Sequence, residues 1–186
     1  MNCSEIYNVT SNRCKFVQKN DSQCNCEKVS VSQYSPGRIE DDEILIRQIY
    51  SPIHIDQETG KVNSLAFDDA KDKGMSVNRK TYTSLEELNK KVEYKLKLDQ
   101  ERGKDRDFIG VVYTTCKNVR AIKTNDNIKA FCVYDTGNKH DISHADICQT
   151  ISSRVEGSKM RFKLRKAFSE KPVTLDVVFT TANNRE

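Results

Sequence analysis

Short runs of apolar, β-branched residues recur along the middle of the chain and predict strands. The run Ile44–Tyr50 is the clearest example, and it is expected to end at Pro52, because proline has no amide hydrogen for a sheet ladder. Similar runs predict strands or shorter extended pieces at residues 64–67, 75–77, 108–115, 119–122 and 128–134.

Two segments carry the signals of helices. In Leu85–Glu101, apolar residues recur at helical spacing, and Ser84 opens a capping box that satisfies free amide groups at the helix start. A second capping box, formed by Ser143 and Asp146, predicts another helix that ends at Gly157.

The segment around residues 159–171 has a period of two. Met160, Phe162 and Leu164 alternate with cationic residues, so we expect a strand with its apolar side chains on one face and its cations on the other. Val173–Thr180 predicts another strand. The chain is therefore expected to end in a β-hairpin.

Together these elements predict an α+β fold, with a single mixed, mainly antiparallel sheet packed by about two helices. Hydrophobic residues make up 36% of the chain and charged residues 31%, which suits one lean core under a highly charged surface. Residues 1–43 are polar and poor in leucine, and they are expected to form a poorly packed N-terminal arm. Residues 44–186 are expected to form the core domain.

Positive charge is concentrated in the predicted hairpin. Residues 157–171 contain six cations and one carboxylate, while the whole chain has a net charge of only +4. Such a row of cations could neutralise nucleic-acid phosphates or meet an acidic protein. The alternative is a solvated outer face, or an edge strand that its charges protect from aggregation. The leading hypothesis is a non-enzymatic accessory or binding module that engages an acidic partner, either protein or nucleic acid. The predicted contact residues are Lys159, Arg161, Lys163, Arg165 and Lys166.

A second hypothesis is an enzyme that acts on a nucleotide or another phosphate-bearing substrate. Arginine and serine side chains can hold a phosphate group, and histidine can act as a general base. The hypothesis requires the candidate side chains to converge in one cleft, whereas the alternative is that the histidine-rich segment only starts a helix. The candidate catalytic residues are His54, His140, His144, Arg47 and Ser76.

The cysteines bear on the compartment and on a third hypothesis. There are seven of them, with no apolar run long enough to span a bilayer and no secretory signal, so reduced thiols in the cytoplasm are expected. Four cysteines in the N-terminal arm could wrap one zinc ion and form a zinc-stabilised interaction domain. Their spacing fits zinc poorly, so scattered thiols are favoured and no cofactor is predicted. The zinc candidates are Cys3, Cys14, Cys24 and Cys26.

Several motifs lie in order within residues 44–150. They are Arg47-Gln48-Ile49, Ala66-Phe67, Ser76-Val77-Asn78-Arg79 and His144-Ala145-Asp146-Ile147. This order resembles that of a group of small bacterial proteins for which no activity is established, so the resemblance implies no catalytic assignment. In outline, an arginine strand followed by a serine strand is similar to ADP-ribosyltransferases, although the catalytic glutamate of those enzymes has no assigned counterpart here.

Overall fold

The computed structural model describes residues 2–180 and is built on a five-stranded sheet in the order β3-β1-β2-β5-β4. Every pair of neighbouring strands is antiparallel, so the predicted α+β fold is confirmed. The strands are β1 (Ile44–Ser51), β2 (Met75–Arg79), β3 (Asp107–Thr115), β4 (Phe131–Tyr134) and β5 (His144–Gln149).

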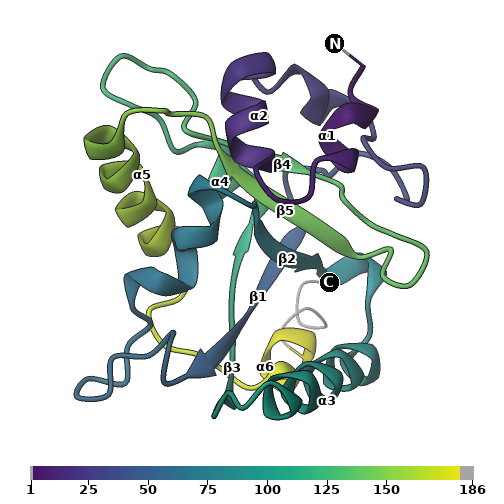
Figure 1. The fold of residues 1–186 in the computed structure, drawn as a ribbon, viewed down its shortest axis with the longest axis vertical. Helices are drawn as coiled ribbons and strands as arrows, with labels where there is room; N and C mark the ends of the chain where they lie inside the picture. The colour runs from purple at the N-terminus through teal and green to yellow at the C-terminus, as the bar shows by residue number, and fades with distance from the viewer. Residues whose placement is uncertain (1, 181–186) are drawn as a thin grey trace.

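Helices cover the sheet on several sides (Figure 1). In this view α3 and α6 lie side by side below β1 and β3, α1 and α2 lie above β4 and β5, and α5 lies to the left of β5. None of the helices in residues 2–180 is long and apolar enough to cross a membrane. The α-helices are α1 (Ser4–Asn8), α2 (Arg13–Asn20), α3 (Leu85–Glu101), α4 (Cys116–Arg120), α5 (Arg154–Ala167) and α6 (Leu175–Thr180), and the 3-10 helices are η1 (Asn25–Lys28), η2 (Ser64–Lys71) and η3 (Lys80–Tyr82).

Three apolar clusters hold these layers together. The largest joins one face of the sheet to η2, α4 and α5, with Phe67 and Leu164 among its buried members. On the other face, α3 and α6 pack on β1 and β3 around Ile46, while the N-terminal helices pack on β4 and β5 around Tyr134. The two clusters on that face leave the middle of the sheet between them, and polar side chains occupy this middle region.

Helix α3 forms as its sequence predicts. The Ser84 hydroxyl accepts a hydrogen bond from the amide of Glu87 at 3.1 Å, and the Glu87 carboxylate accepts one from the Ser84 amide at 2.7 Å. This capping box satisfies two amides that have no partner inside the helix. The helix buries Leu88 and Val92, whereas its lysines are exposed or half-buried.

In the later part of the chain, a predicted helix is a strand and predicted strands are helices. The predicted helix after Ser143 is the strand β5, which is buried almost throughout because helices cover both of its faces. The predicted cationic strand is helix α5, whose buried residues Gly157, Met160 and Leu164 follow helical spacing. Phe162, which should have lain with Met160 on one strand face, is 54% exposed. The predicted C-terminal hairpin is therefore wrong, since its second strand is also replaced, by α6.

Two of the shorter predicted strands are also helical. Residues 64–71 form the 3-10 helix η2, which is capped by the Asn63 side chain through a 2.9 Å hydrogen bond from the Leu65 amide. Residues 116–120 form α4, which is capped by Thr115. Both segments pack an apolar side against the sheet, and a short apolar run does not by itself separate this arrangement from a strand.

The N-terminal segment is well packed, in contrast to the expected loose arm. Ile6, Cys14 and Val17 are completely buried. Disulfides join Cys3 to Cys26 and Cys24 to Cys132, so the second bond ties the segment directly to β4. The prediction of reduced thiols is therefore wrong for these four cysteines, and Cys14, Cys116 and Cys148 are free and buried.

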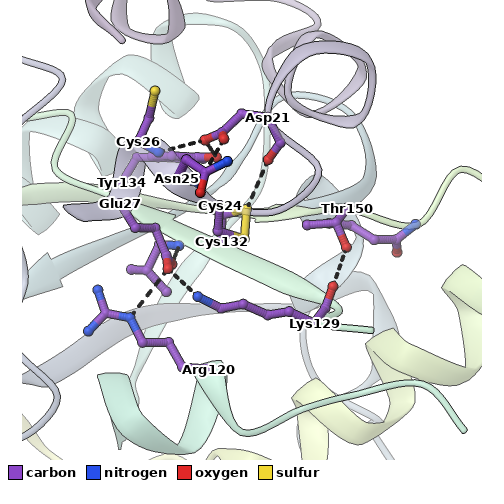
Figure 2. The surroundings of a disulfide bond; sticks show 12 residues. Asp21, Cys24, Asn25, Cys26, Glu27, Arg120, Lys129, Cys132, Tyr134 and Thr150 are labelled. Atoms are coloured by element: carbon purple, nitrogen blue, oxygen red, sulfur yellow. Dashed lines mark hydrogen bonds and ion pairs between the residues drawn. A yellow bond between two sulfur atoms is a disulfide. The ribbon is translucent and has the colours of Figure 1, made fainter. Parts of the chain in front are cut away.

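Buried carboxylates fix the same segment around the Cys24–Cys132 bond (Figure 2). The Asp21 carboxylate accepts hydrogen bonds from the Tyr134 hydroxyl at 2.8 Å and from the Asn25 amide at 2.7 Å. The Glu27 carboxylate contacts the Lys129 ammonium group and lies 3.5 Å from Nε of Arg120. These contacts join residues 2–28 to β4 and its neighbours.

The remainder of the segment wraps around the fully buried Arg79 at the end of β2. Its guanidinium donates to both carboxylate oxygens of Glu43, at 2.8 and 2.7 Å. It also donates to the carbonyl oxygens of Gly37 and Arg38 at 2.7 and 3.1 Å. Residues 37–43 therefore satisfy a buried cation instead of forming a free linker.

Candidate functional site

A cavity of about 730 Å³ opens where the middle of the sheet is left uncovered. Its wall is formed by β1, β2 and α3 together with the segment from Ile53 to Lys73, the 104–106 loop and the start of β5. Its volume lies within the range of sites for small molecules. The wall is mostly polar, with Ile53 and Leu65 as its aliphatic members.

A break in strand pairing creates the space. Strands β1 and β2 pair at only two positions, the second of which joins Ile46 to Asn78, and beyond it β1 continues beside β3 alone. The Arg47 side chain fills the resulting gap, donating to the carbonyl oxygen of Ser76 at 2.9 Å and to that of Ala66 at 3.2 Å. These two bonds hold the guanidinium at the cavity wall, and burial lowers its pKa while the nearby Asp69 carboxylate opposes that shift.

The cavity wall carries an excess of positive charge. Its two carboxylates belong to Asp69 and Asp141. A recess lined mainly by one sign of charge concentrates ions of the opposite sign. The six cations of the wall are Arg47, Lys73, Lys91, Lys95, Lys104 and Arg106.

Three of these cations share one further carboxylate. Asp99, which is buried near the end of α3, lies 3.1 Å from Nη1 of Arg106, 3.6 Å from Nζ of Lys95 and 4.0 Å from Nζ of Lys104. Burial would raise the pKa of Asp99, but the three cations outweigh it and lower the pKa below its ordinary value. One negative charge cannot neutralise three positive ones, so this end of the cavity remains cationic.

Lys91 is fixed at the opposite wall by a polar network. Its ammonium group donates to Asp141 at 2.7 Å and to the Ser143 hydroxyl at 3.0 Å, and the Asn78 amide donates to the same two side chains at 3.2 and 2.8 Å. Burial would raise the pKa of Asp141, whereas hydrogen bonds from Lys91 and Ser143 lower it and prevail. The network joins α3 to the turn before β5.

His54 presents a neutral ring at the cationic end. The Tyr50 amide donates to Nδ1 at 3.2 Å, so the neutral ring carries its hydrogen on Nε2. Burial, with a further contribution from the positive charges of Arg47, Arg106 and Lys95, lowers the pKa of His54 to about 4. At neutral pH the side chain is therefore an uncharged hydrogen-bond donor among cations.

His144 has the opposite tautomer. Its Nδ1 lies 2.8 Å from the Thr136 hydroxyl oxygen and 3.3 Å from the Thr136 carbonyl oxygen, which can only accept a hydrogen bond. The hydroxyl donates its own hydrogen to Asp146 at 2.9 Å, so it also accepts from Nδ1. The hydrogen is consequently on Nδ1, and Nε2 of the neutral ring offers a lone pair.

The Asp146 carboxylate that starts this chain of hydrogen bonds is buried and paired. It contacts the Arg13 guanidinium of α2 and accepts a 3.4 Å hydrogen bond from the Ser76 hydroxyl. Arg13 also donates to the carbonyl oxygens of Ile6 and Tyr7, at 2.9 and 3.1 Å. The sequence-based assignment of Asp146 to a helix cap is thus wrong, because it is the buried anion that connects the N-terminal helices to His144.

Four of the five candidate catalytic residues line the cavity together, namely Arg47, His54, Ser76 and His144. The fifth, His140, lies in an exposed turn outside it, where its amide donates to the Asn138 side chain at 2.9 Å. The convergence required by the enzyme hypothesis is met by four residues, and their catalytic role stays a prediction.

The five predicted partner-binding cations all lie on α5, away from the cavity. Arg161 is turned inward, since it donates to Asp68 at 3.1 Å and to Gln149 at 2.8 Å. Lys159, Lys163 and Lys166 are exposed. The cations therefore do not form one face of a strand, and at least Arg161 has a structural role.

Three of the four zinc candidates are in disulfides, because Cys3 is bonded to Cys26 and Cys24 to Cys132. The fourth candidate, Cys14, is a free buried thiol. Across residues 2–180 no group of three or more His, Cys, Asp or Glu side chains is arranged to hold a metal ion. Zinc binding by the N-terminal cysteines stays a prediction from the sequence.

Comparison with known proteins assigns no family: no family model matches the chain, and neither the curated proteins nor the solved structures include a significant match. The geometry of the cavity is therefore the basis for the functional argument.

The sequence did not identify several residues that line the cavity or support its wall. Lys91 and Lys95 are four apart on a helix that was predicted, so their shared face was available as a signal. No such signal marks Thr136 or Arg13, because each acts through a tertiary contact with Asp146. Thr136 is 10 residues from Asp146 in the sequence, and Arg13 is 133 residues from it.

Proposed function

We propose that the protein binds a phosphate-bearing small molecule in the cavity and acts on it as an enzyme. The observation that carries the proposal is the gathering of six cations around two histidines with opposite hydrogen-bonding character. Phosphate oxygens accept hydrogen bonds from Arg, Lys and the N–H of a neutral histidine. A lone pair on a second histidine supplies the base that a hydrolytic or transfer reaction needs.

The two ends of the cavity would have different roles. Arg106, Lys95 and the Nε2–H of His54 would hold the phosphate, because three cations share one carboxylate there. Arg47, whose charge also acts on His54, would assist them from the neighbouring wall. At the other end, His144 would accept a proton from water through Nε2 as the water oxygen attacks the phosphorus of an ester or anhydride, and the leaving group would depart with the bonding electrons. The Thr136–Asp146 pair would keep the His144 ring in the required tautomer.

Calorimetric titration with ADP tests the binding half of this proposal. ADP should bind with an affinity that falls as salt rises, whereas uncharged adenosine should not bind. Lys95→Ala should weaken ADP binding by about tenfold, the effect of losing one charge-assisted hydrogen bond. Lys97→Ala is the matched control, because Lys97 lies on the same helix but is exposed and outside the wall. Equal effects of the two substitutions, or no binding of any phosphate compound, would refute the site.

The catalytic half is tested with His144→Gln, which keeps a polar side chain but has no basic nitrogen. We expect the variant to retain ADP affinity within about threefold, since His144 is outside the cationic end, and to lose at least about a hundredfold in turnover. The measurement is chromatography of the products formed from a panel of nucleotides. If the wild-type protein converts none of them, or the variant is as active as the wild type, the enzyme role fails while the binding site stands or falls separately.

The compartment belongs to the same proposal. The assignment to the cytoplasm rested on reduced thiols, and it stays a prediction. Two disulfides are typical of proteins that work under oxidising conditions, so we infer that the active form keeps them oxidised. Alkylation under denaturing, non-reducing conditions followed by mass spectrometry should label only the three free cysteines, Cys14, Cys116 and Cys148. Labelling of all seven in protein isolated from its native cell would support the cytoplasmic alternative.

A further inference from the structure

Helix α5 exposes large apolar side chains on the face that it turns away from the sheet. Val155 is 67% exposed and Phe162 is 54% exposed, while Gly157, Met160 and Leu164 are buried on the opposite side. The two exposed residues are seven positions apart, which places them on one face and about 10 Å from each other along the helix axis. They are therefore two separate apolar points on a shared surface.

Cations surround both points. The same face forms a shallow groove of about 790 Å³, which we call the α5 groove, lined by Arg154, Val155, Ser158, Lys159, Phe162, Lys163 and Lys166. Glu156 is the acidic residue of the helix, and it lies 3.6 Å from Nζ of Lys159. The Lys166 ammonium group lies 4.7 Å above the centre of the Phe162 ring. Four cations against one carboxylate leave the groove with a net positive charge.

We propose that the α5 groove is a docking site for an acidic protein segment that carries apolar anchor residues. Charge complementarity selects the acidic character, because Arg154, Lys159, Lys163 and Lys166 frame the groove. The exposed Phe162 and Val155 supply contacts that only an apolar side chain of the partner can use. The mode resembles the docking of an amphipathic segment, with anchors about two helical turns apart.

Two other occupants fit the groove less well. A membrane surface favours a helix with a broad apolar face, and α5 offers only two apolar side chains there because its Met160 and Leu164 are buried in the core. Nucleic-acid phosphates would use the cations but would leave Val155 without a contact, and Lys166 already occupies one face of the Phe162 ring, which limits base stacking there. The combination of apolar points and cations therefore favours a protein segment.

Fluorescence polarisation with synthetic probes tests the groove in the full-length protein. The first probe is a short fluorescein-labelled peptide of alternating Glu and Leu, the second replaces Leu by Gly at equal charge, and the third is single-stranded DNA. The Glu-Leu peptide should bind at least about tenfold more tightly than the Glu-Gly peptide, because only it reaches the apolar points. The same binding should persist with ADP present, since the cavity is elsewhere.

Substitutions in the groove assign the binding to α5. Phe162→Ala and Lys163→Glu should each weaken binding of the Glu-Leu peptide by about tenfold, with little effect on folding because both side chains are exposed. The matched controls are Tyr94→Ala, a 66% exposed aromatic residue on α3, and Lys97→Glu, and both should change binding by less than about twofold. The proposal is overturned if neither peptide binds, if the Glu-Gly peptide binds equally well, or if DNA binds more tightly and Phe162→Ala has no effect.

Discussion

At the scale of single residues, the cavity depends on two histidines whose partners impose different tautomers. A backbone amide donates to Nδ1 of His54, and a backbone carbonyl accepts from Nδ1 of His144. In the neutral rings, Nε2 of His54 therefore carries a hydrogen, whereas Nε2 of His144 carries a lone pair. The first offers a donor and the second offers an acceptor within one cavity. A ligand with an anionic group and an acidic proton would match both, which is why we propose a phosphate-bearing molecule and not a simple anion.

The buried state of His54 predicts a specific dependence of stability on pH. Its pKa is about 4 in the folded protein and near 6.5 when unfolded, so between these values the unfolded chain takes up a proton that the folded protein refuses. Stability should therefore fall as the pH is lowered through this range, by about 1–2 kcal/mol between pH 7 and pH 5. Urea unfolding of the wild type and of His54→Gln measures the effect, because glutamine can keep the hydrogen bond from the Tyr50 amide. An equal pH dependence in both proteins would contradict the assignment.

At the scale of elements, the predictions succeeded where the local pattern allowed one interpretation. Leu85–Glu101 has a capping box and a helical stripe, and Ile44–Tyr50 has a buried run closed by proline, and both form as expected. The failures are segments whose pattern fits both periods. Met160 and Leu164 are four apart, which suits a helix, but with Phe162 between them they also suit a strand.

The same distinction between local and non-local signals applies to the candidate site. Arg47, His54, Ser76 and His144 were selected by chemical type, and the structure brings them together because the pairing of β1 and β2 breaks off after Ile46. Nothing local in the sequence marks that break, which follows from β1 continuing along β3. The strand β5 was mistaken for a helix because Ser143 and Asp146 have the spacing of a capping box. Asp146 is instead buried in the strand, where Arg13 of the N-terminal helices pairs with its carboxylate.

At the scale of the whole molecule, the N-terminal segment and the cavity are one connected structure. The Cys24–Cys132 bond holds the segment on β4, and Arg13 of the same segment contacts the carboxylate that orients Thr136 and His144. Arg13 is also fixed through carbonyl groups of α1, whose flanking Cys3 forms the second disulfide. Loss of the disulfides should therefore disturb the orientation of His144. The cationic end of the cavity, which belongs to α3 and the 104–106 loop, should stay in place.

The two disulfides should differ in their effect on stability because they close loops of different length. The Cys24–Cys132 bond spans 108 residues and the Cys3–Cys26 bond spans 23, so loop-closure entropy gives about 5 and about 3 kcal/mol, respectively. Replacing Cys24 and Cys132 by serine should accordingly lower the free energy of unfolding by about 1–2 kcal/mol more than replacing Cys3 and Cys26. Denaturant unfolding of the two double variants, with and without dithiothreitol, measures this difference. Dithiothreitol should lower the wild-type value most, and identical values for the two variants would show that the 108-residue loop is already closed by residual structure in the unfolded chain.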